Sequence, residues 1–178
     1  MSFLDDEYDV PSSGGQYFRP AMGDNRIRIM SDALTGYEYW NTDNKPIRSH
    51  EEPAIDEMIN PKRNKDGVIQ PAKHFWAMVI WDYKDNQVKV WEATQATIQK
   101  KILTLFRTEE WGNPQQYDLT ITRSGEGLDT EYEVVAMPKK DILTSQADAF
   151  AQANVNLEAL ITGDNPFGEK VDLNKINV

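Results

Sequence analysis

The chain has 178 residues, no cysteine, two histidines and a formal net charge of −10. These counts exclude disulfide frameworks, cysteine zinc sites, iron–sulfur clusters and histidine-rich metal centres. A core of this size folds without such cross-links, so one domain of ordinary size is expected. The sequence contains no apolar run of 18 residues, and its first ten residues lack the basic start of a signal peptide. The expected location is the cytosol of the cell that makes the protein.

Most of the acidity lies at the two ends of the chain. Residues 1–15 and 141–178 each carry −4, whereas residues 16–140 carry only −2 and hold 17 of the 19 basic side chains. We therefore expect an acidic flexible N-terminus (1–15), a central domain (16–140), and a C-terminal helix with a mildly acidic tail (141–178). The total charge argues against a polyanionic partner, but a nearly neutral body can present one basic face. Solubility alone is the alternative explanation for the acidic ends.

The first strand is predicted at residues 25–30, where isoleucines at 27 and 29 alternate with Arg26 and Arg28. This pattern indicates a half-buried strand with a basic outer face. Residues 31–72 then form a stretch that is too long for a plain loop. It contains a short aromatic strand at 37–40 and a basic patch made of Lys62, Arg63 and Lys65.

The clearest predicted feature is an apolar β-hairpin at residues 73–93, with its turn at Asp85-Asn86. Pairing Asp82 with Lys89 would place opposite charges face to face, and this pairing sets the expected register. The same register pairs Ile80 with Trp91.

Both faces of this hairpin are apolar, so one of them is expected to contact a ligand, the long insert or a partner. Phe75, Val79 and Trp81 share one face, and Trp76 and Trp91 share the other. Lys89 lies on the side of Trp76 and Trp91, which favours that face for the ligand.

A helix is predicted at residues 94–106, with Thr94 as its N-cap, followed by strands at 117–123 and 131–135 and a last amphipathic helix at 146–162. A helix between the third and fourth of five major strands is the order of the OB-fold, a partly open barrel. We therefore predict a mainly β protein, a five-stranded OB-fold β-barrel with accessory helices. It would carry a long insert (33–72) between strands 1 and 2 and a C-terminal helix. The rival is an unrelated mixed α+β sandwich with the same element order.

Aromatic and basic side chains interleave in the part of the chain that an OB-fold uses for binding. Cations that follow the backbone and rings that stack on bases are the means by which proteins bind single-stranded nucleic acid. For each ring, a place in the core is the competing interpretation. The candidate binding residues are Arg26, Arg28, Tyr37, Tyr39, Trp40, Arg48, Lys62, Arg63, Lys65, Lys73, Trp76, Lys89 and Trp91.

The sequence contains no recognisable catalytic constellation. The stretch His50-Glu51-Glu52 lacks the second histidine of a zinc-protease helix. The glycine-rich stretch 124–129 lacks the lysine of a phosphate-binding loop and is better explained as a turn between two strands. We expect a protein without enzymatic activity, metal or cofactor.

Three stretches of the chain resemble the phage-encoded single-stranded DNA-binding proteins. They are YFRP leading into GDNRIRIMSDALTGYEYW, KHFWAMVIWDY with VKVWEATQATIQKKI, and YDLTITRSGEGLDTEY, which together cover roughly residues 16–135. The resemblance implies an OB-fold, sequence-independent binding of single-stranded DNA, and roles in phage DNA replication, recombination and repair in the cytoplasm of the infected bacterial host. It also implies phage or host replication and recombination proteins as partners, and homo-oligomers along the DNA.

The alternative is a non-catalytic protein-interaction or virion-assembly module whose aromatic face binds protein. The acidic total charge favours this alternative. The interleaved aromatic and basic residues and the family resemblance favour single-stranded DNA binding.

Overall fold

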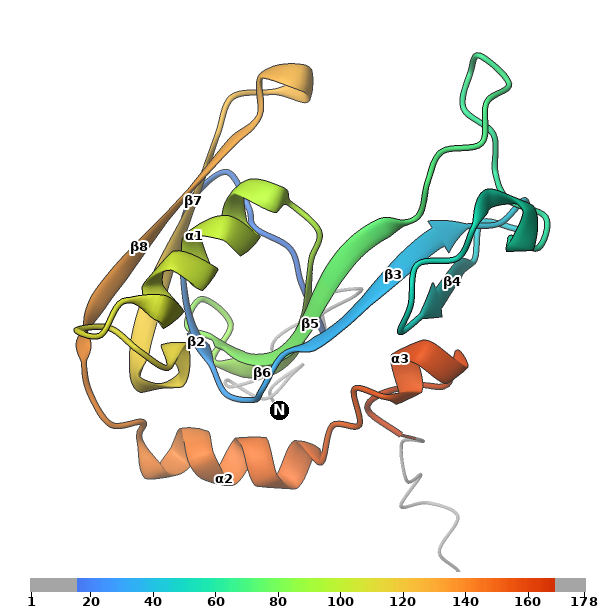
Figure 1. Cartoon of the computed structure of the whole chain (residues 1–178). Coiled ribbons are helices and arrows are strands. Elements are labelled where there is room, and N and C mark those ends of the chain that lie inside the picture. The colour runs from blue at the N-terminus through green and yellow to red at the C-terminus, as the bar shows by residue number, and fades with distance from the viewer. Residues whose placement is uncertain (1–15, 169–178) are drawn as a thin grey trace, which may run out of the picture.

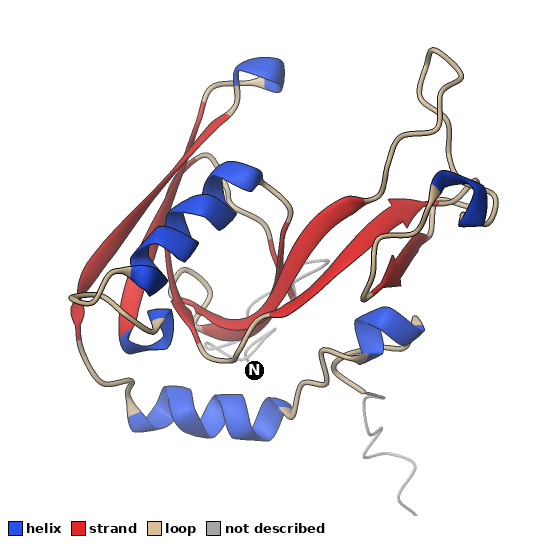
Figure 2. Cartoon of the chain, viewed as in Figure 1, coloured by secondary structure: helices blue, strands red, loops and turns tan. Residues whose placement is uncertain are grey.

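The computed structural model describes residues 16–168, in which one strongly curled sheet forms a partly open barrel and a helix packs against it by one face (Figure 1; Figure 2). The expected acidic N-terminus at 1–15 lies outside the described residues. The helices are α1 (Ala96–Arg107), α2 (Thr144–Ala153) and α3 (Ala159–Thr162), with short 3-10 turns η1 (Ile55–Glu57), η2 (Pro114–Gln116) and η3 (Gly127–Asp129). The strands are β1 (Tyr17–Phe18), β2 (Gly23–Ile29), β3 (Leu34–Trp40), β4 (Pro46–Ser49), β5 (Lys73–Asp82), β6 (Gln87–Ala93), β7 (Tyr117–Ser124) and β8 (Glu131–Lys139).

The predicted mainly β architecture with accessory helices is confirmed. The five expected barrel strands correspond to β2, β5, β6, β7 and β8, and α1 lies between the third and fourth of them. The strands follow the order β1-β6-β5-β2-β7-β8, with β3 paired to β4 and β5. Ile98 and Ile102 of α1 are buried in the barrel core. This arrangement fits a partly open barrel of the OB type.

The first barrel strand is longer than the sequence pattern indicates. Both β2 and β3 pair antiparallel with β5, through Ile29↔Ile80 and then Leu34↔Ala77. Residues 30–33 form an irregularity between these two halves, where Ser31 Oγ accepts the N–H of Val79 at 2.9 Å. The insert predicted at 33–72 therefore begins only after β3, and its first eight residues belong to the barrel.

The predicted hairpin register was wrong by two residues. Trp81 pairs with Val88, Ile80 with Lys89, and Met78 with Trp91. The charge pair that suggested the register nevertheless forms, because Lys89 Nζ reaches Asp82 Oδ2 diagonally at 2.8 Å. A diagonal contact lies within reach of a long side chain, so it does not identify directly opposed residues.

The two faces of the β5–β6 hairpin lie in two separate cores. Met78, Ile80 and Trp91 point into the barrel, where they pack with β2, β7 and α1. The other face carries the outer cluster, which consists of the buried residues Phe75, Ala77, Val79, Trp81 and Val90.

The C-terminal segment (144–168) covers this outer cluster. Phe150, Val155 and Leu157 pack on it, and Leu160 is buried within it. Figure 1 shows α2 and α3 lying along one side of the sheet, where α2 contacts β6 and α3 contacts β4. The segment therefore covers the face of Phe75, Val79 and Trp81, which is the opposite face to the one that the sequence favoured for a ligand.

The helix predicted at 146–162 is in fact two helices. Asn154 caps α2 in the left-handed conformation, with φ 45° and ψ 50°, a conformation that asparagine tolerates better than most residues. The break turns Val155 and Leu157 onto the sheet, so the segment follows the sheet's curvature. None of the helices within residues 16–168 is long and apolar enough to cross a membrane.

Candidate nucleic-acid interface

A groove of about 870 Å³ runs between the β3–β4 hairpin and the place where β7 ends and β8 begins. The beginning of the described chain, the end of β6 with the residues that follow it, and α3 with the residues after it supply its remaining walls. The long loops after β4 and between β7 and β8 extend beyond the barrel toward the same side in Figure 1. These are the first and last inter-strand loops, which OB-folds use to bind oligonucleotides.

Three aromatic rings are presented along this groove. Trp40 is 47 % exposed, Tyr17 is 40 % exposed, and Tyr132 is half-buried. Tyr17 is held edge-on by Phe167 of the C-terminal segment, with the ring centroids 5.9 Å apart. Partly exposed, braced rings of this kind are suited to stacking on bases.

Four cations and three carboxylates line the groove, and they occupy different depths. Arg19 and Lys45 are exposed, whereas Arg48 and Arg123 are half-buried. The acidic side chains that line the groove are Glu38, Glu92 and Asp164.

The deeper part of the groove is organised around Arg48, which lies between two carboxylates. Its Nη2 lies 2.7 Å from Oε1 of Glu92, and its Nε donates to Oε2 of Glu38 at 3.2 Å. Burial raises the pKa of Glu92, and the charge of Glu38 adds to this effect while Arg48 opposes it. Burial together with the charge of Glu92 also raises the pKa of the Tyr17 hydroxyl. Arg48 is thus shared between the two acids, and the charge of Arg19 also acts to lower the pKa of Glu92.

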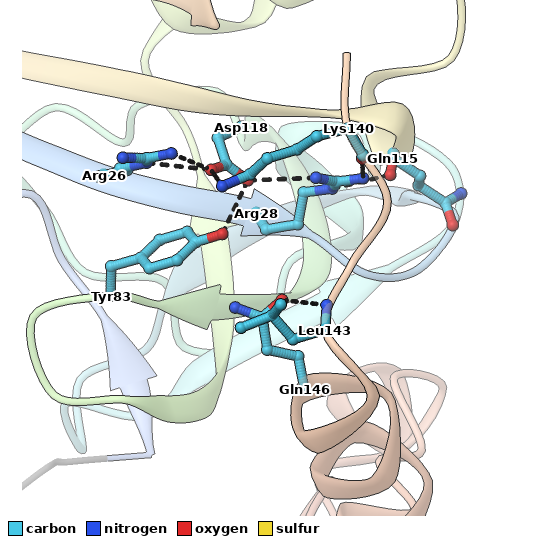
Figure 3. A network of polar contacts seen from close by, with 8 residues as sticks. All are labelled: Arg26, Arg28, Tyr83, Gln115, Asp118, Lys140, Leu143 and Gln146. Atoms are coloured by element: carbon cyan, nitrogen blue, oxygen red, sulfur yellow. Dashed lines mark hydrogen bonds and ion pairs between the residues drawn. The ribbon is translucent and has the colours of Figure 1, made fainter. Parts of the chain in front are cut away.

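Arg26 and Arg28, predicted to form a basic outer face, are instead held by the buried carboxylate of Asp118 (Figure 3). Arg26 Nη2 lies 2.7 Å, Arg28 Nη1 3.2 Å and Lys140 Nζ 3.1 Å from this carboxylate, which also accepts the hydroxyl of Tyr83 at 3.0 Å. Burial alone would raise the pKa of Asp118, but these hydrogen bonds outweigh it and lower the pKa.

The expectation of an exposed basic strand was therefore wrong for Arg28. Its side chain is 3 % exposed, and it also donates to the backbone oxygens of Gln115 and Lys140. Arg26 remains 44 % exposed, so it keeps a solvent-facing edge.

The ligand-facing assignment of Trp91 and Lys89 also needs correction, whereas that of Trp76 stays a prediction. Trp91 is 1 % exposed and packs edge-on against Phe18, so it supports the groove from the core. Lys89 is 6 % exposed and donates to Asp82 and Asp85; these hydrogen bonds raise its pKa although burial opposes them. Trp76 is half-buried in a separate apolar pocket beside Phe106.

The remaining candidates lie on and around the insert. Tyr37 packs against His74, and the Tyr39 hydroxyl accepts the backbone N–H of Ile59. Four exposed cations lie in the long loop after β4 and at the start of β5; they are Lys62, Arg63, Lys65 and Lys73.

The groove therefore brings together three of the residues singled out from the sequence, namely Trp40, Arg48 and Trp91. The sequence prediction counted Lys45 among the interleaved basic residues but did not include it among the binding residues. It also did not include five other aromatic and basic residues of the lining, although all of them lie in the stretches that carry the family resemblance: Tyr17, Phe18, Arg19, Arg123 and Tyr132. Arg123 and Tyr132 pair across β7 and β8 at the base of the last loop, so their position beside that loop was the available signal. Among residues 16–168, no cluster of three acidic or histidine side chains is arranged to hold a metal ion.

Comparison with known proteins supports the family resemblance seen in the sequence. No family model matches the chain, and no solved structure matches it. A protein of Escherichia phage T5, described as a probable ssDNA-binding protein, is 31 % identical over 133 residues, which cover 63 % of this chain and 51 % of the phage protein. The chain thus spans about half the length of that relative. The resemblance to phage-encoded single-stranded DNA-binding proteins is confirmed by this similarity.

Proposed function

We propose that this protein binds single-stranded DNA in the groove between the β3–β4 hairpin and β7–β8. The observation that carries the proposal is the combination of partly exposed Trp40 and Tyr17 with exposed Arg19 and Lys45 along one groove. Rings stack on bases of any sequence, and the cations attract the phosphates. Binding of this kind requires no particular sequence.

The insert cations extend this binding surface in the proposal. Lys62, Arg63 and Lys65 are exposed on the loop after β4, which meets the groove where the backbone N–H of Lys62 donates to the backbone oxygen of Trp40 at 2.8 Å. From there they would follow the DNA backbone. The similarity to the phage T5 protein supports this function. We further propose that the protein acts without catalysis in phage DNA replication, recombination and repair in the infected bacterial cytoplasm, with phage or host replication proteins and further copies of itself as partners.

The alternative is a module that binds protein through the aromatic face of the hairpin, and it lacks an open hairpin face, although the acidic total charge still favours it. The outer cluster on that face is covered by the chain's own C-terminal segment. The other face of the β5–β6 hairpin lies inside the barrel.

The test is a titration of the protein with a labelled oligo(dT), followed by anisotropy and by tryptophan fluorescence. Stacking on Trp40 should quench part of the intrinsic fluorescence, and duplex DNA should do so much less. The logarithm of the binding constant should fall with the logarithm of salt, by about 0.7 per phosphate contacted. Tight oligo(dT) binding with neither quenching nor salt dependence would contradict the groove.

A pair of matched double variants locates the binding site. Removing two groove cations in Arg19→Gln/Lys45→Gln should flatten the salt slope by about 1.4, because each lost phosphate contact contributes about 0.7. Lys84→Gln/Arg107→Gln removes two exposed cations that do not line the groove and should leave the slope unchanged. The reverse result would place the DNA elsewhere on the surface.

A further inference from the structure

The deep part of the groove is unsuited to phosphates, which distinguishes it from the exposed rim. Glu38 is 8 % exposed, the Glu92 side chain is 19 % exposed, and both face the same arginine. Arg48 and Arg123 balance these two carboxylates in number, so the deep part holds no excess cation that would attract a phosphate, whereas Arg19 and Lys45 are exposed at the rim. If DNA enters this groove, its phosphates must stay near Arg19 and Lys45 while its bases point inward.

Two further polar atoms in the groove lining have unused hydrogen-bonding capacity. Gln95 Oε1 and Arg123 Nε are both buried and have no hydrogen-bond partner among the described residues. Buried polar atoms are seldom left unpaired, and an unpaired one commonly marks a site that something else completes. Here the missing partner would have to donate to Gln95 and accept from Arg123.

A guanine base offers this combination on its edges. Its N1–H and N2 amino group are adjacent donors that a carboxylate accepts together, and its O6 and N7 accept from arginine. Thymine presents a single N3–H between two carbonyl oxygens, which a carboxylate repels. Bases that are splayed out of a strand are commonly read in this way, by hydrogen bonds to their edges while aromatic rings stack on their faces.

We propose that the deep part of the groove is a base-selective pocket that prefers guanine to thymine, with Glu92 and Gln95 as acceptors and Arg123 as donor. This inference rests on the proposed function, because it requires single-stranded DNA in the groove. It adds a preference at one position to a surface that otherwise binds any sequence. Cytosine and adenine, which each present one amino group, should rank between guanine and thymine.

The experiment uses the full chain and a set of labelled oligo(dT) strands of about 12 nucleotides, within the range that one OB-fold occupies. One central position carries guanine, inosine, cytosine, adenine or thymine, and affinities are measured by anisotropy. Guanine should improve the affinity over thymine by about 5- to 150-fold, the range for a bidentate base contact. Inosine, which lacks only the N2 amino group, should lose most of that gain.

Matched variants then assign the preference to Glu92. The nearly isosteric Glu92→Gln should bring the guanine-to-thymine ratio close to one. Glu133→Gln, at an exposed position on β8 outside the groove, should keep the wild-type ratio. Thermal denaturation followed by circular dichroism verifies that both variants are folded.

The outcomes separate this inference from the proposed function. If all strands bind with salt dependence and equal affinity, the base-selective pocket is refuted and DNA binding stands. An undiminished guanine preference in folded Glu92→Gln would also overturn the assignment. If no strand binds the wild-type protein at all, the proposed function fails and this inference fails with it.

Discussion

Replacing Trp40 and Trp91 separately by alanine should separate DNA binding from folding. Both tryptophans line the groove, but Trp40 is 47 % exposed at its edge, whereas Trp91 is 1 % exposed in the barrel core. Trp91 also packs edge-on against Phe18, with the ring centroids 5.5 Å apart. A ring that stacks on a base contributes mainly to binding, and a ring that fills the core contributes mainly to stability.

The structure gives the expected magnitudes. Trp40→Ala should weaken oligo(dT) binding by about 1–3 kcal/mol, the usual contribution of one stacked base, which is roughly a 5- to 150-fold loss. Its free energy of unfolding should change by about 1 kcal/mol or less. Trp91→Ala should lower the free energy of unfolding by about 3–5 kcal/mol, because it leaves a large cavity in the core.

Urea denaturation followed by circular dichroism measures the stability of each variant, and anisotropy with labelled oligo(dT) measures its affinity. The reasoning is refuted if Trp40→Ala binds like the wild type, or if its loss of binding is accompanied by unfolding. Trp91→Phe keeps most of the apolar volume and should retain both stability and binding, so it controls for a Trp91→Ala protein that does not fold.

Three further predictions concern the interior. Asp118→Asn should lower the free energy of unfolding at pH 7 by about 3–5 kcal/mol, because it leaves the charge of Arg28 buried without a partner. Because the pKa of Asp118 is lowered in the folded state, the wild type should lose stability as the pH falls below 3.8 and this carboxylate becomes protonated. The Asp118→Asn variant should not show this loss, which urea denaturation at a series of pH values measures. Because burial raises the pKa of Glu92 in the folded state, protonation of this carboxyl stabilises the fold at pH values below 4.5. This stabilisation is lost as the pH rises through the folded-state pKa. Glu92→Gln should therefore remove that loss, so its stability should change less than the wild type's between pH 4 and 7 in the same titration. Leu160→Ala should cost about 2–5 kcal/mol in urea denaturation, because Leu160 is buried in the outer cluster; a change below 0.5 kcal/mol would show that α3 is not docked as described.

The strands were predictable because their signal is local. Alternating side chains marked β2 and β7, and the apolar run at 73–93 marked β5 and β6 to within a residue. The two-residue error in the hairpin register has a physical origin. Lys89 is long enough to reach Asp82 from a diagonal position, so the attraction between them is compatible with two registers.

The site was less predictable because its residues depend on partners far away in sequence. The alternating pattern of β2 correctly placed Arg28 opposite Ile27 and Ile29, but that pattern holds no information about Asp118, 90 residues later, which draws Arg28 into the interior. The groove likewise joins Tyr17 to Arg123 through the fold alone. No spacing within one segment could have indicated that pairing.

The C-terminal segment explains why DNA is proposed to lie in the groove rather than on the hairpin. In an OB-fold, oligonucleotides bind on the face of the second and third strands. In this protein that face holds the outer cluster, and Phe150, Val155, Leu157 and Leu160 cover it. Leu160, Gly163 and Asp164 also line the groove, so the segment that closes one surface forms a wall of the other. A chain cut after residue 140 would expose the outer cluster and lose that wall. Any change in its affinity would then combine altered folding with altered charge, so the influence of the acidic C-terminal residues on DNA binding has to be measured in chains that retain residues 144–168.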